Sequence, residues 1–236
     1  ITWLAVACIL LLGQCNRKKQ EQQPVRNPGD KPNIVILFAD DLGYGDLGTY
    51  GHPTIETPHL DGMAEQGMKF TQFYVAATVC TPSRGALLTG RLPVRTGIHS
   101  GVYFPGYSMG IPQEEITTAE ALKDAGYATA CYGKWHLGNK HPYLPTNHGF
   151  DEYFRIPYSN DMGQKIPLIR DSTVIEEDVD QRGLTRRYTE HALEFIRDHR
   201  EEPFFLYLPY TFPHTPLFAS ETFQDTSKRG LYGDVV

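Results

Sequence analysis

The sequence predicts an α/β fold around a mostly parallel sheet, and two observations carry this prediction. Residues 33–39 form a continuous apolar run, which is typical of a central strand buried on both faces. Helical and strand-like segments then alternate along the chain, as they do when parallel strands are joined by helical crossovers. The 236 residues are enough for one sizeable α/β core or for half of a larger one.

Composition narrows the class of protein further. With 40% apolar and 21% charged residues, the chain is ordinary for a globular protein. Its net charge is −6, so the chain lacks the excess of positive charge that attracts nucleic acid, and we expect no nucleic-acid partner. The four cysteines are too few and too scattered to form a disulfide framework.

The first 31 residues are expected to precede the folded domain. Residues 1–15 fit an export signal, because an apolar run too short to span a bilayer leads to a weak lipoprotein cleavage sequence at Cys15. Either Cys15 is lipidated and tethers the protein to a membrane, or the signal is simply cleaved. Residues 16–31 form a polar tether, and 32–236 the folded part.

These features predict an exported protein, located in the periplasm or cell envelope or secreted. We also expect a fragment, because the chain begins without methionine and stops soon after a helix-like start at 228–232.

Two adjacent carboxylates, Asp40 and Asp41, directly follow the first predicted strand. In open α/β sheets, ligands bind at the carboxyl ends of the strands. Neighbouring carboxylates repel each other unless protons or a cation compensate. A hard divalent ion such as calcium or magnesium would do so through oxygen ligands. The alternative is that one aspartate caps the next helix and the other is solvated.

A short helix at 57–67 comes next, with Thr57 as its cap, Pro58 at its start and Gly67 at its end. Its apolar stripe is expected to face the core. Residues 70–75 then combine aromatic and β-branched side chains, which predicts a strand.

Cys80 stands at the start of the following helix. Thr81 suits the cap, Pro82 the first helical position and Gly90 the end. Cys80 would then lie beside free helix N–H groups, which attract anions and lower the pKa of a thiol. Arg84, one turn on, would add a positive fork suited to oxyanions. The alternative is that Cys80 is a small buried apolar residue.

The next helix and strand lead to a lysine and a histidine. Thr117 and Glu120 form a capping box, and residues 127–132 predict a strand. Lys134 and His136 follow; two residues apart on extended backbone, they would point to the same side. Lysine would supply a positive charge and histidine a proton donor near neutral pH. A solvated lysine and a packed histidine are the alternative.

Fewer signals mark the rest of the chain. We expect a loop at 148–162, a surface hairpin within 165–180, and an amphipathic helix at 184–200. A buried strand at 204–208 follows, and His214 comes soon after it.

The candidate site consists of the polar groups that follow predicted strands. A parallel sheet brings such strand ends together on one rim. A divalent metal, an anion-stabilising pair of cations, two histidines and a nucleophile position suit hydrolysis of a sulfate or phosphate ester. The residues concerned are Asp40, Asp41, Cys80, Arg84, Lys134, His136 and His214.

Three stretches of the chain resemble the type I sulfatases, and most closely their arylsulfatase A-like branch. Cys80–Arg84, followed by Leu-Leu-Thr-Gly, is similar to the first signature of that family, and 126–136 to the second. The opening at 33–46, which carries the acidic pair, is also similar. The resemblance runs from about Lys31 to the end of the chain, and only Thr78 and Tyr132 depart from the signatures.

This resemblance implies an alkaline-phosphatase-like fold, with a mostly parallel central sheet flanked by helices on both faces. It also implies that Cys80 is oxidised to formylglycine (3-oxoalanine) by a separate formylglycine-generating enzyme. One hydroxyl of the hydrated aldehyde would attack sulfur, and the other would drive elimination of sulfate. A plain serine would lack that exit.

The resemblance further implies roles for single residues. Asp40, Asp41 and the modified Cys80 would approach a calcium ion, and Arg84 and Lys134 would hold the hydrate and the developing charge. His136 would assist elimination. His214 and Ser159 would contact the sulfate or the leaving oxygen, with His214 placed to protonate the alcohol. The implied partner is a sulfated small molecule or glycan.

Other ligands of this family come from a later segment. Two carboxylates are fewer than the about six to eight oxygens that calcium takes. We therefore expect this chain alone to be inactive and to bind calcium weakly. Two other readings remain: a phosphatase or phosphodiesterase of the same superfamily, and a non-catalytic, lipid-tethered glycan-binding protein of sulfatase ancestry.

Overall fold

The structure is a computed structural model that describes residues 31–236. Residues Pro32–Val236 form one compact unit. The export signal, Cys15 and most of the predicted tether lie outside the described residues. Of the helices described here, none has the length and apolar character needed to cross a membrane.

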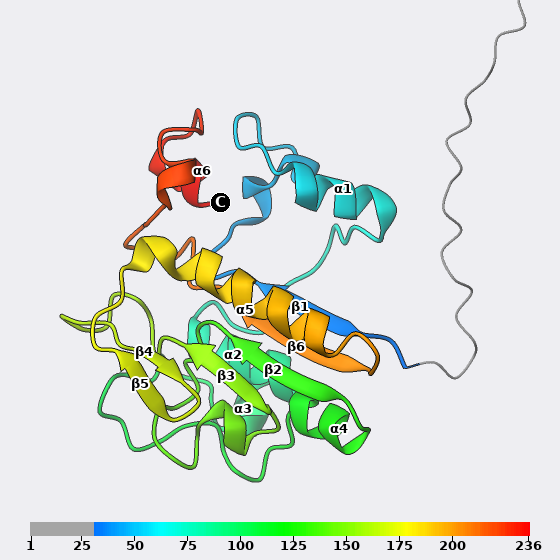
Figure 1. The fold of residues 1–236 in the computed structure, drawn as a ribbon, viewed down its shortest axis with the longest axis vertical. Coiled ribbons are helices and arrows are strands. Elements are labelled where there is room, and N and C mark those ends of the chain that lie inside the picture. Colours follow the sequence, from blue (N-terminus) through cyan, green and yellow to red (C-terminus); the bar gives the residue numbers. More distant parts are fainter. Residues whose placement is uncertain (1–30) are drawn as a thin grey trace, which may run out of the picture. The chain divides into compact units, whose positions relative to one another are not determined.

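A six-stranded, mostly parallel sheet forms the centre of this unit, as the sequence predicted (Figure 1). The strand order is β1-β6-β2-β3-β4-β5. The first four of these strands pair in parallel, and β4 and β5 add an antiparallel hairpin at one side. The strands are β1 (Ile34–Phe38), β2 (Ala128–Tyr132), β3 (Glu152–Arg155), β4 (Leu168–Arg170), β5 (Thr173–Glu176) and β6 (Phe204–Pro209).

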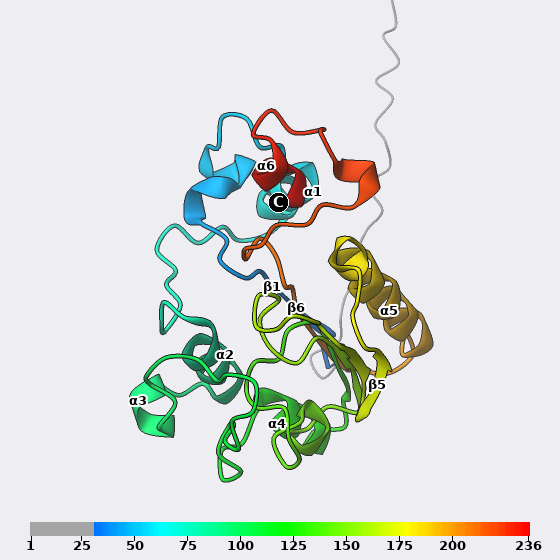
Figure 2. The same ribbon diagram turned by 90° about the vertical axis from the view of Figure 1, so that its left-hand side faces the viewer.

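Helices lie on both faces of the sheet, giving three layers (Figures 1 and 2). Helix α5 (Leu184–Asp198) runs along one face, and α2 (Cys80–Thr89), α3 (Pro93–Thr96) and α4 (Thr118–Asp124) lie on the other. Two further α-helices are α1 (Pro58–Gln66) and α6 (Leu231–Val235). Single 3-10 turns occur at Tyr44–Asp46, Gly48–Tyr50, Pro145–Asn147, Gln181–Gly183 and Glu221–Phe223.

Each face of the sheet has its own apolar core. On the α5 face, Leu206 of β6 and Phe154 of β3 pack with Tyr188 and Phe195 of α5. On the other face, Phe205 and Tyr207 of β6 belong to a second cluster that includes Leu88 of α2 and Ala119 of α4. Because its side chains alternate between two buried faces, β6 is the fully buried strand of the sheet.

The strongest local patterns predicted their elements correctly. Helix α5 buries Leu184, Tyr188, Ala192 and Phe195, which follow the helical spacing of the sequence. The capping box of α4 forms as expected: the Thr117 hydroxyl accepts from the Glu120 N–H at 3.1 Å, and the Glu120 carboxylate accepts from the Thr117 N–H at 2.8 Å. The hairpin predicted within 165–180 is β4–β5.

The strand predicted at 70–75 is absent, and so is the buried stripe of α1. Phe73 and Tyr74 are 67% and 80% exposed, and no described strand pairs with this segment. Met63 of α1 is likewise 61% exposed. Strand propensity reflects packing against neighbours more than an intrinsic backbone preference, so the aromatic run alone does not make a strand.

Two other expectations were wrong in detail. Strand β1 pairs only with β6 among the described strands, and Val35 and Leu37 are each 45% exposed, so β1 is not buried on both faces. Helix α2 begins at Cys80 with Val79 as its cap. Thr81 is the second residue of the helix and does not cap it; its hydroxyl donates to the His136 carbonyl at 2.9 Å and accepts from the Tyr103 N–H at 3.2 Å.

Strand β3 was not predicted at all. Residues 148–162 were expected to form a loop, yet Glu152, Tyr153 and Phe154 pair in parallel with β2. The segment has only two apolar residues, Tyr153 and Phe154, between polar ends, so its sequence shows no clear strand pattern. In the structure these two side chains pack into the cores on opposite faces of the sheet. This strand positions Ser159 of the site described next.

Candidate active site

The ends of four parallel strands and one helix start supply the candidate site. Asp40 follows β1, Lys134 follows β2, Ser159 follows β3 and His214 follows β6. Cys80 is the first residue of α2. The parallel order β1-β6-β2-β3 places these strand ends on one edge of the sheet, as expected from the positions of Asp40, Lys134 and His214 in the sequence.

A close approach of backbones holds Lys134 at this edge. The Lys134 N–H donates to the carbonyl of Pro209, at the end of β6, at 2.7 Å. Gly133 just before it has φ +137°, and a Cβ there would lie 1.9 Å from the same carbonyl oxygen. Only glycine permits both the conformation and the contact, so Gly133 ties the end of β2 to the end of β6.

Asp40 lies between two buried cations. Its Oδ1 accepts from Arg84 Nη2 at 2.9 Å, and its Oδ2 accepts from Lys134 Nζ at 2.5 Å. The side chains of all three residues are at most 5% exposed. Burial alone would raise the pKa of Asp40, but Arg84 and Lys134 together hold it below its ordinary value. Asp40 is therefore ionised and is the counterion of both cations.

The thiol of Cys80 lies against this ion cluster. Its Sγ is 3.6 Å from Asp40 Oδ1 and 3.4 Å from Lys134 Nζ. Burial raises the pKa of the thiol and outweighs the opposing effect of Lys134. The expectation that the helix start lowers the pKa of Cys80 was thus wrong, because desolvation of the thiolate costs more than the nearby cations return.

His136 is held in an unusual conformation beneath the site. Its backbone is left-handed, with φ +56°, so the expected extended geometry from Lys134 to His136 is not present. The Nε2 donates to the Tyr103 carbonyl at 2.9 Å, because a carbonyl can only accept. Burial first, then Lys134 and Arg84, lower the pKa of His136 to about 3. His136 is therefore neutral at pH 7, with Nδ1 as its unprotonated nitrogen.

Ser159 joins Lys134 to His214. Its hydroxyl oxygen lies 3.0 Å from Lys134 Nζ and 3.1 Å from His214 Nε2. The His214 Nδ1 donates to the Thr215 carbonyl at 2.5 Å, which leaves Nε2 to accept from the serine hydroxyl. Asp41 Oδ2 is 3.7 Å from His214 Nε2, but its side chain is 56% exposed. The two aspartates therefore differ: Asp40 is buried and paired, and Asp41 faces solvent.

The residues present fit a hard divalent ion as a partial site. Ligand atoms of Asp40, Cys80 and His214 lie within 4.8 Å of one another. Asp40 is ionised because of its two cationic neighbours, and a carboxylate has about four lone-pair sites, more than these two cations use. Asp41 adds a second carboxylate beside His214. Carboxylate oxygens are suitable ligands for calcium, but these residues provide fewer than the about six that it takes.

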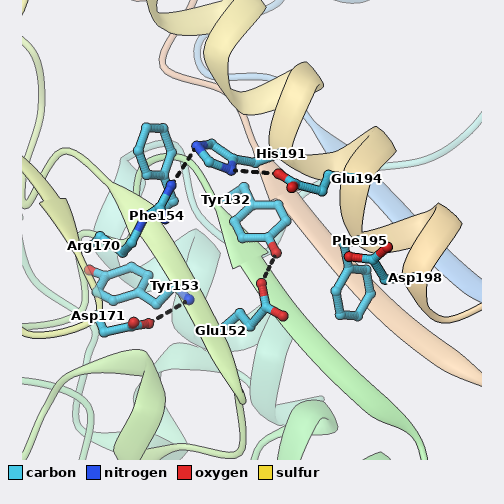
Figure 3. Close-up of a pocket in the computed structure, with 10 residues that line it drawn as sticks. All are labelled: Tyr132, Glu152, Tyr153, Phe154, Arg170, Asp171, His191, Glu194, Phe195 and Asp198. Carbon is cyan, nitrogen blue, oxygen red and sulfur yellow. Dashed lines mark hydrogen bonds and ion pairs between the residues drawn. The ribbon is translucent and has the colours of Figure 1, made fainter.

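A cavity on the α5 face of the sheet is lined by none of the predicted site residues (Figure 3). Its volume is about 280 Å³, and it is formed by α5 together with β2, β3 and the β4–β5 turn. Tyr132, one of the departures from the family signature, faces this cavity and donates to Glu152 at 2.5 Å. The larger side chain is thus accommodated on the α5 face, away from Lys134.

Sequence reasoning missed two features of the site. The first is the carbonyl of Tyr103, which orients His136 and carries no side-chain signal. The second is the counterion role of Asp40, since a lysine and an arginine distant in sequence gave no indication that they share one carboxylate.

The fold and the site together define an α/β protein with a cluster of charged and polar groups at the ends of its parallel strands. The sulfatase family model matches residues 32–233, and the chain belongs to the sulfatase family.

Named relatives agree with this assignment. The chain is 46% identical to an arylsulfatase of Hemicentrotus pulcherrimus, with 89% of this chain and 42% of the relative covered. It is 44% identical to human arylsulfatase A, with 86% and 45% covered. It is 45% identical to rat N-acetylgalactosamine-6-sulfatase, with 87% and 44% covered. The chain thus spans less than half the length of these curated relatives.

Solved structures share the fold. One, from work on the metabolism of multiple glycosaminoglycans by Bacteroides thetaiotaomicron, matches with a TM-score of 0.80 and 30% identity, covering 87% of this chain and 56% of that one. Another, bound to its substrate D-glucosamine-2-N,6-O-disulfate, matches with a TM-score of 0.65 and 27% identity, covering 79% and 35%.

Proposed function

We propose that the protein to which this chain belongs hydrolyses sulfate monoesters, either aryl sulfates or sulfated carbohydrates. The observation that carries the proposal is the position of Cys80. It opens α2 within the motif Cys-Thr-Pro-Ser-Arg, and its Sγ lies 3.4 Å from Lys134 Nζ and 3.6 Å from Asp40. Membership of the sulfatase family, with relatives named for aryl and sugar sulfates, supports it.

We propose that Cys80 is converted to formylglycine before the protein folds, by a separate generating enzyme. The raised pKa of the Cys80 thiol supports this, because a protonated, half-buried thiol is a poor nucleophile at neutral pH. When present, the hydrated aldehyde supplies two geminal hydroxyls, one to attack sulfur and one to release sulfate.

A calcium ion would be held by Asp40 and Asp41 next to residue 80. Bound there, it supplies positive charge that polarises a sulfate oxygen and favours ionisation of a neighbouring hydroxyl. The remaining ligands are proposed to come from outside this chain. We therefore propose that the chain alone is inactive and binds calcium weakly, which isothermal titration of calcium into it measures; tight binding contradicts the proposal.

The chain's own residues would orient the substrate and move protons. Lys134 reaches residue 80 and Ser159, so its ammonium can hold an oxyanion placed between them. His214 accepts at Nε2, and after taking a proton it would deliver it to the departing alcohol. We propose that His136 assists the elimination step through Nδ1, which is unprotonated and has no hydrogen-bond partner among the described residues.

Arg84 has structural contacts beside the role expected from the sequence. Both of its terminal nitrogens are engaged, one by Asp40 and the other by the Lys134 carbonyl at 2.8 Å. We propose that Arg84 fixes Asp40 and the backbone of Lys134, and that its charge acts on the hydrate through this fixed arrangement.

Mass spectrometry of the peptide containing Cys80 tests the proposal. The parent protein is produced with and without a formylglycine-generating enzyme, and the peptide is treated with a hydrazide reagent. Loss of the thiol and formation of a hydrazone are expected only with that enzyme. Cys131, which is completely buried and carries no such motif, is the internal control and stays a thiol. An unmodified Cys80 in an active protein would contradict the proposal.

Export is proposed separately. Radiolabelled palmitate supplied to cells that produce the parent protein distinguishes a lipidated Cys15 from a cleaved signal, and Cys15→Ser is the control. Retention of the whole leader in the cytoplasm would contradict both alternatives.

A further inference from the structure

A pocket of about 220 Å³ adjoins the candidate active site, on the side of Ser159. Its walls come from two segments, the loop at Pro105 and the stretch from Pro157 to Pro167. Both segments also belong to the site: Tyr103, two residues before Pro105, orients His136, and Ser159 contacts Lys134 and His214. The pocket therefore shares Ser159 with the groups that are proposed to hold the sulfate.

Most of the pocket surface is apolar. Pro105, Met162, Ile166 and Pro167 contribute hydrocarbon side chains, and Ile166 is buried and held by its N–H, which donates to Asp178 at 3.1 Å. The volume suits one ring, since a ring has an apolar face that such walls can cover. A ring leaving group attached to the sulfate would occupy this space.

One charged group, Lys165, lines the pocket. Its side chain is exposed, and no carboxylate of the described residues lies within ion-pair distance of its ammonium. Asp178 accepts the Ile166 N–H and forms no ion pair with Lys165. An ammonium without a partner at the edge of an apolar pocket attracts an anionic substituent on the ring that enters.

We propose that this pocket binds the leaving group of the substrate and selects a ring that carries a second anionic group, a further sulfate or a carboxylate, through Lys165. The inference rests on the proposed sulfatase function and deepens it, because it names the chemistry of the alcohol part of the ester. Ser159 then separates two recognition areas, with the reacting sulfate on the Lys134 side and the ring on the Lys165 side.

Two matched substrates test the proposal in the full-length parent protein. Glucosamine 6-O-sulfate is supplied with either an N-acetyl or an N-sulfate group, so that only the second anionic group differs. Lys165→Met removes the charge while keeping the chain length, and Lys165→Arg restores a charge. We expect Lys165→Met to lower kcat/KM about 3- to 10-fold for the disulfate and less than about twofold for the monosulfate. Lys165→Arg should recover most of the loss.

Lys228→Met is the matched control. Lys228 is also an exposed lysine with no ion pair among the described residues, and it does not line the pocket. It should not change the ratio of the two kcat/KM values. Met162→Trp, which fills the pocket, should lower kcat/KM for both sugars.

Failure of this inference can be distinguished from failure of the proposed function. If the wild-type protein turns over both sugars and Lys165→Met leaves their ratio unchanged, the pocket proposal is wrong and the sulfatase proposal stands. If no sulfate ester is turned over, the sulfatase proposal fails. Binding of the two sugars to a Cys80→Ser variant, followed by NMR line broadening, then decides the pocket proposal: a preference for the disulfate that Lys165→Met abolishes supports it, and equal binding overturns it.

Discussion

Replacing Asp40 by asparagine is the sharpest test of how the site is held together. The change keeps the shape of the side chain and removes one negative charge that serves Arg84 and Lys134. Lys134 would keep only the Ser159 hydroxyl and the Cys80 thiol near its ammonium, and Arg84 would keep the Lys134 carbonyl. Two almost completely buried cations would then lack a counterion.

The burial of the three charges sets the size of the effect. The side chains of Lys134, Arg84 and Asp40 are 0%, 1% and 5% exposed, so little water can replace the lost charge. Removing one partner of a buried ion pair costs about 3–5 kcal/mol. A domain is stable by only about 5–15 kcal/mol, so Asp40→Asn should remove a large part of the free energy of unfolding. Adding Lys134→Met should recover part of this loss, because it removes one uncompensated cation.

Urea denaturation in the presence of a chelator measures this effect without a contribution from bound metal. Glu176→Gln is the control, since Glu176 pairs with Arg187 at the surface, where side-chain exposures are 40% and 28%, and should cost about 0–1 kcal/mol. The pH dependence gives a second check. Because the folded pKa of Asp40 is lowered, its stabilisation is present above the ordinary value of 3.8 and is lost as pH falls through the folded pKa. An Asp40→Asn effect no larger than that of Glu176→Gln would refute the argument.

Three further predictions concern the parts that support the site. Leu88→Ala removes a completely buried side chain of α2 and should cost about 2–5 kcal/mol in urea denaturation, whereas Met63→Ala, 61% exposed on α1, should cost well under about 1 kcal/mol. Thr117→Ala removes the cap of α4 and a bond to the His148 carbonyl and should cost about 1–2 kcal/mol, with Thr117→Ser close to wild type by the same assay. The pKa of His136 is lowered from 6.5 to about 3, so between these values the unfolded state binds a proton that the folded state does not, and stability should fall as pH falls. His136→Gln should reduce that slope, and urea midpoints measured from pH 7 to pH 4 that keep the wild-type slope would contradict the assignment.

Elements that a local sequence pattern encodes were predicted, whereas elements that depend on pairing with a distant segment were not. Helix α5 and the capping box at Thr117 follow from the spacing of residues close together in the sequence, and both were predicted correctly. The segment at 70–75 has the composition of a strand but no partner among the described strands. Strand β3 has only four residues and exists because β2 offers it an edge. Pairing between distant segments is not visible in a single local pattern.

The site shows the same division. The rule that ligands gather at strand ends was sufficient to bring Asp40, Lys134 and His214 together. It could not reveal that Asp40 neutralises Arg84 and Lys134, since this depends on three side chains meeting in the interior. For the same reason the pKa of Cys80 was misjudged: the helix start was visible in the sequence, but the burial that raises the pKa was not.

Ser159 follows the rule that ligand-binding groups gather at strand ends, and Cys80 does not. Ser159 was supported in the sequence only by a short family match, yet it follows β3, and β3 lies beside β2 in parallel. Its contact with Lys134 is thus a consequence of the same topology that places the other groups. Cys80 is the exception, because it enters the site from α2, which packs on the sheet through buried Arg84 and Leu88. Since Arg84 also binds Asp40 and the Lys134 carbonyl, the residue that docks the helix is the one that aligns Cys80 with the strand ends.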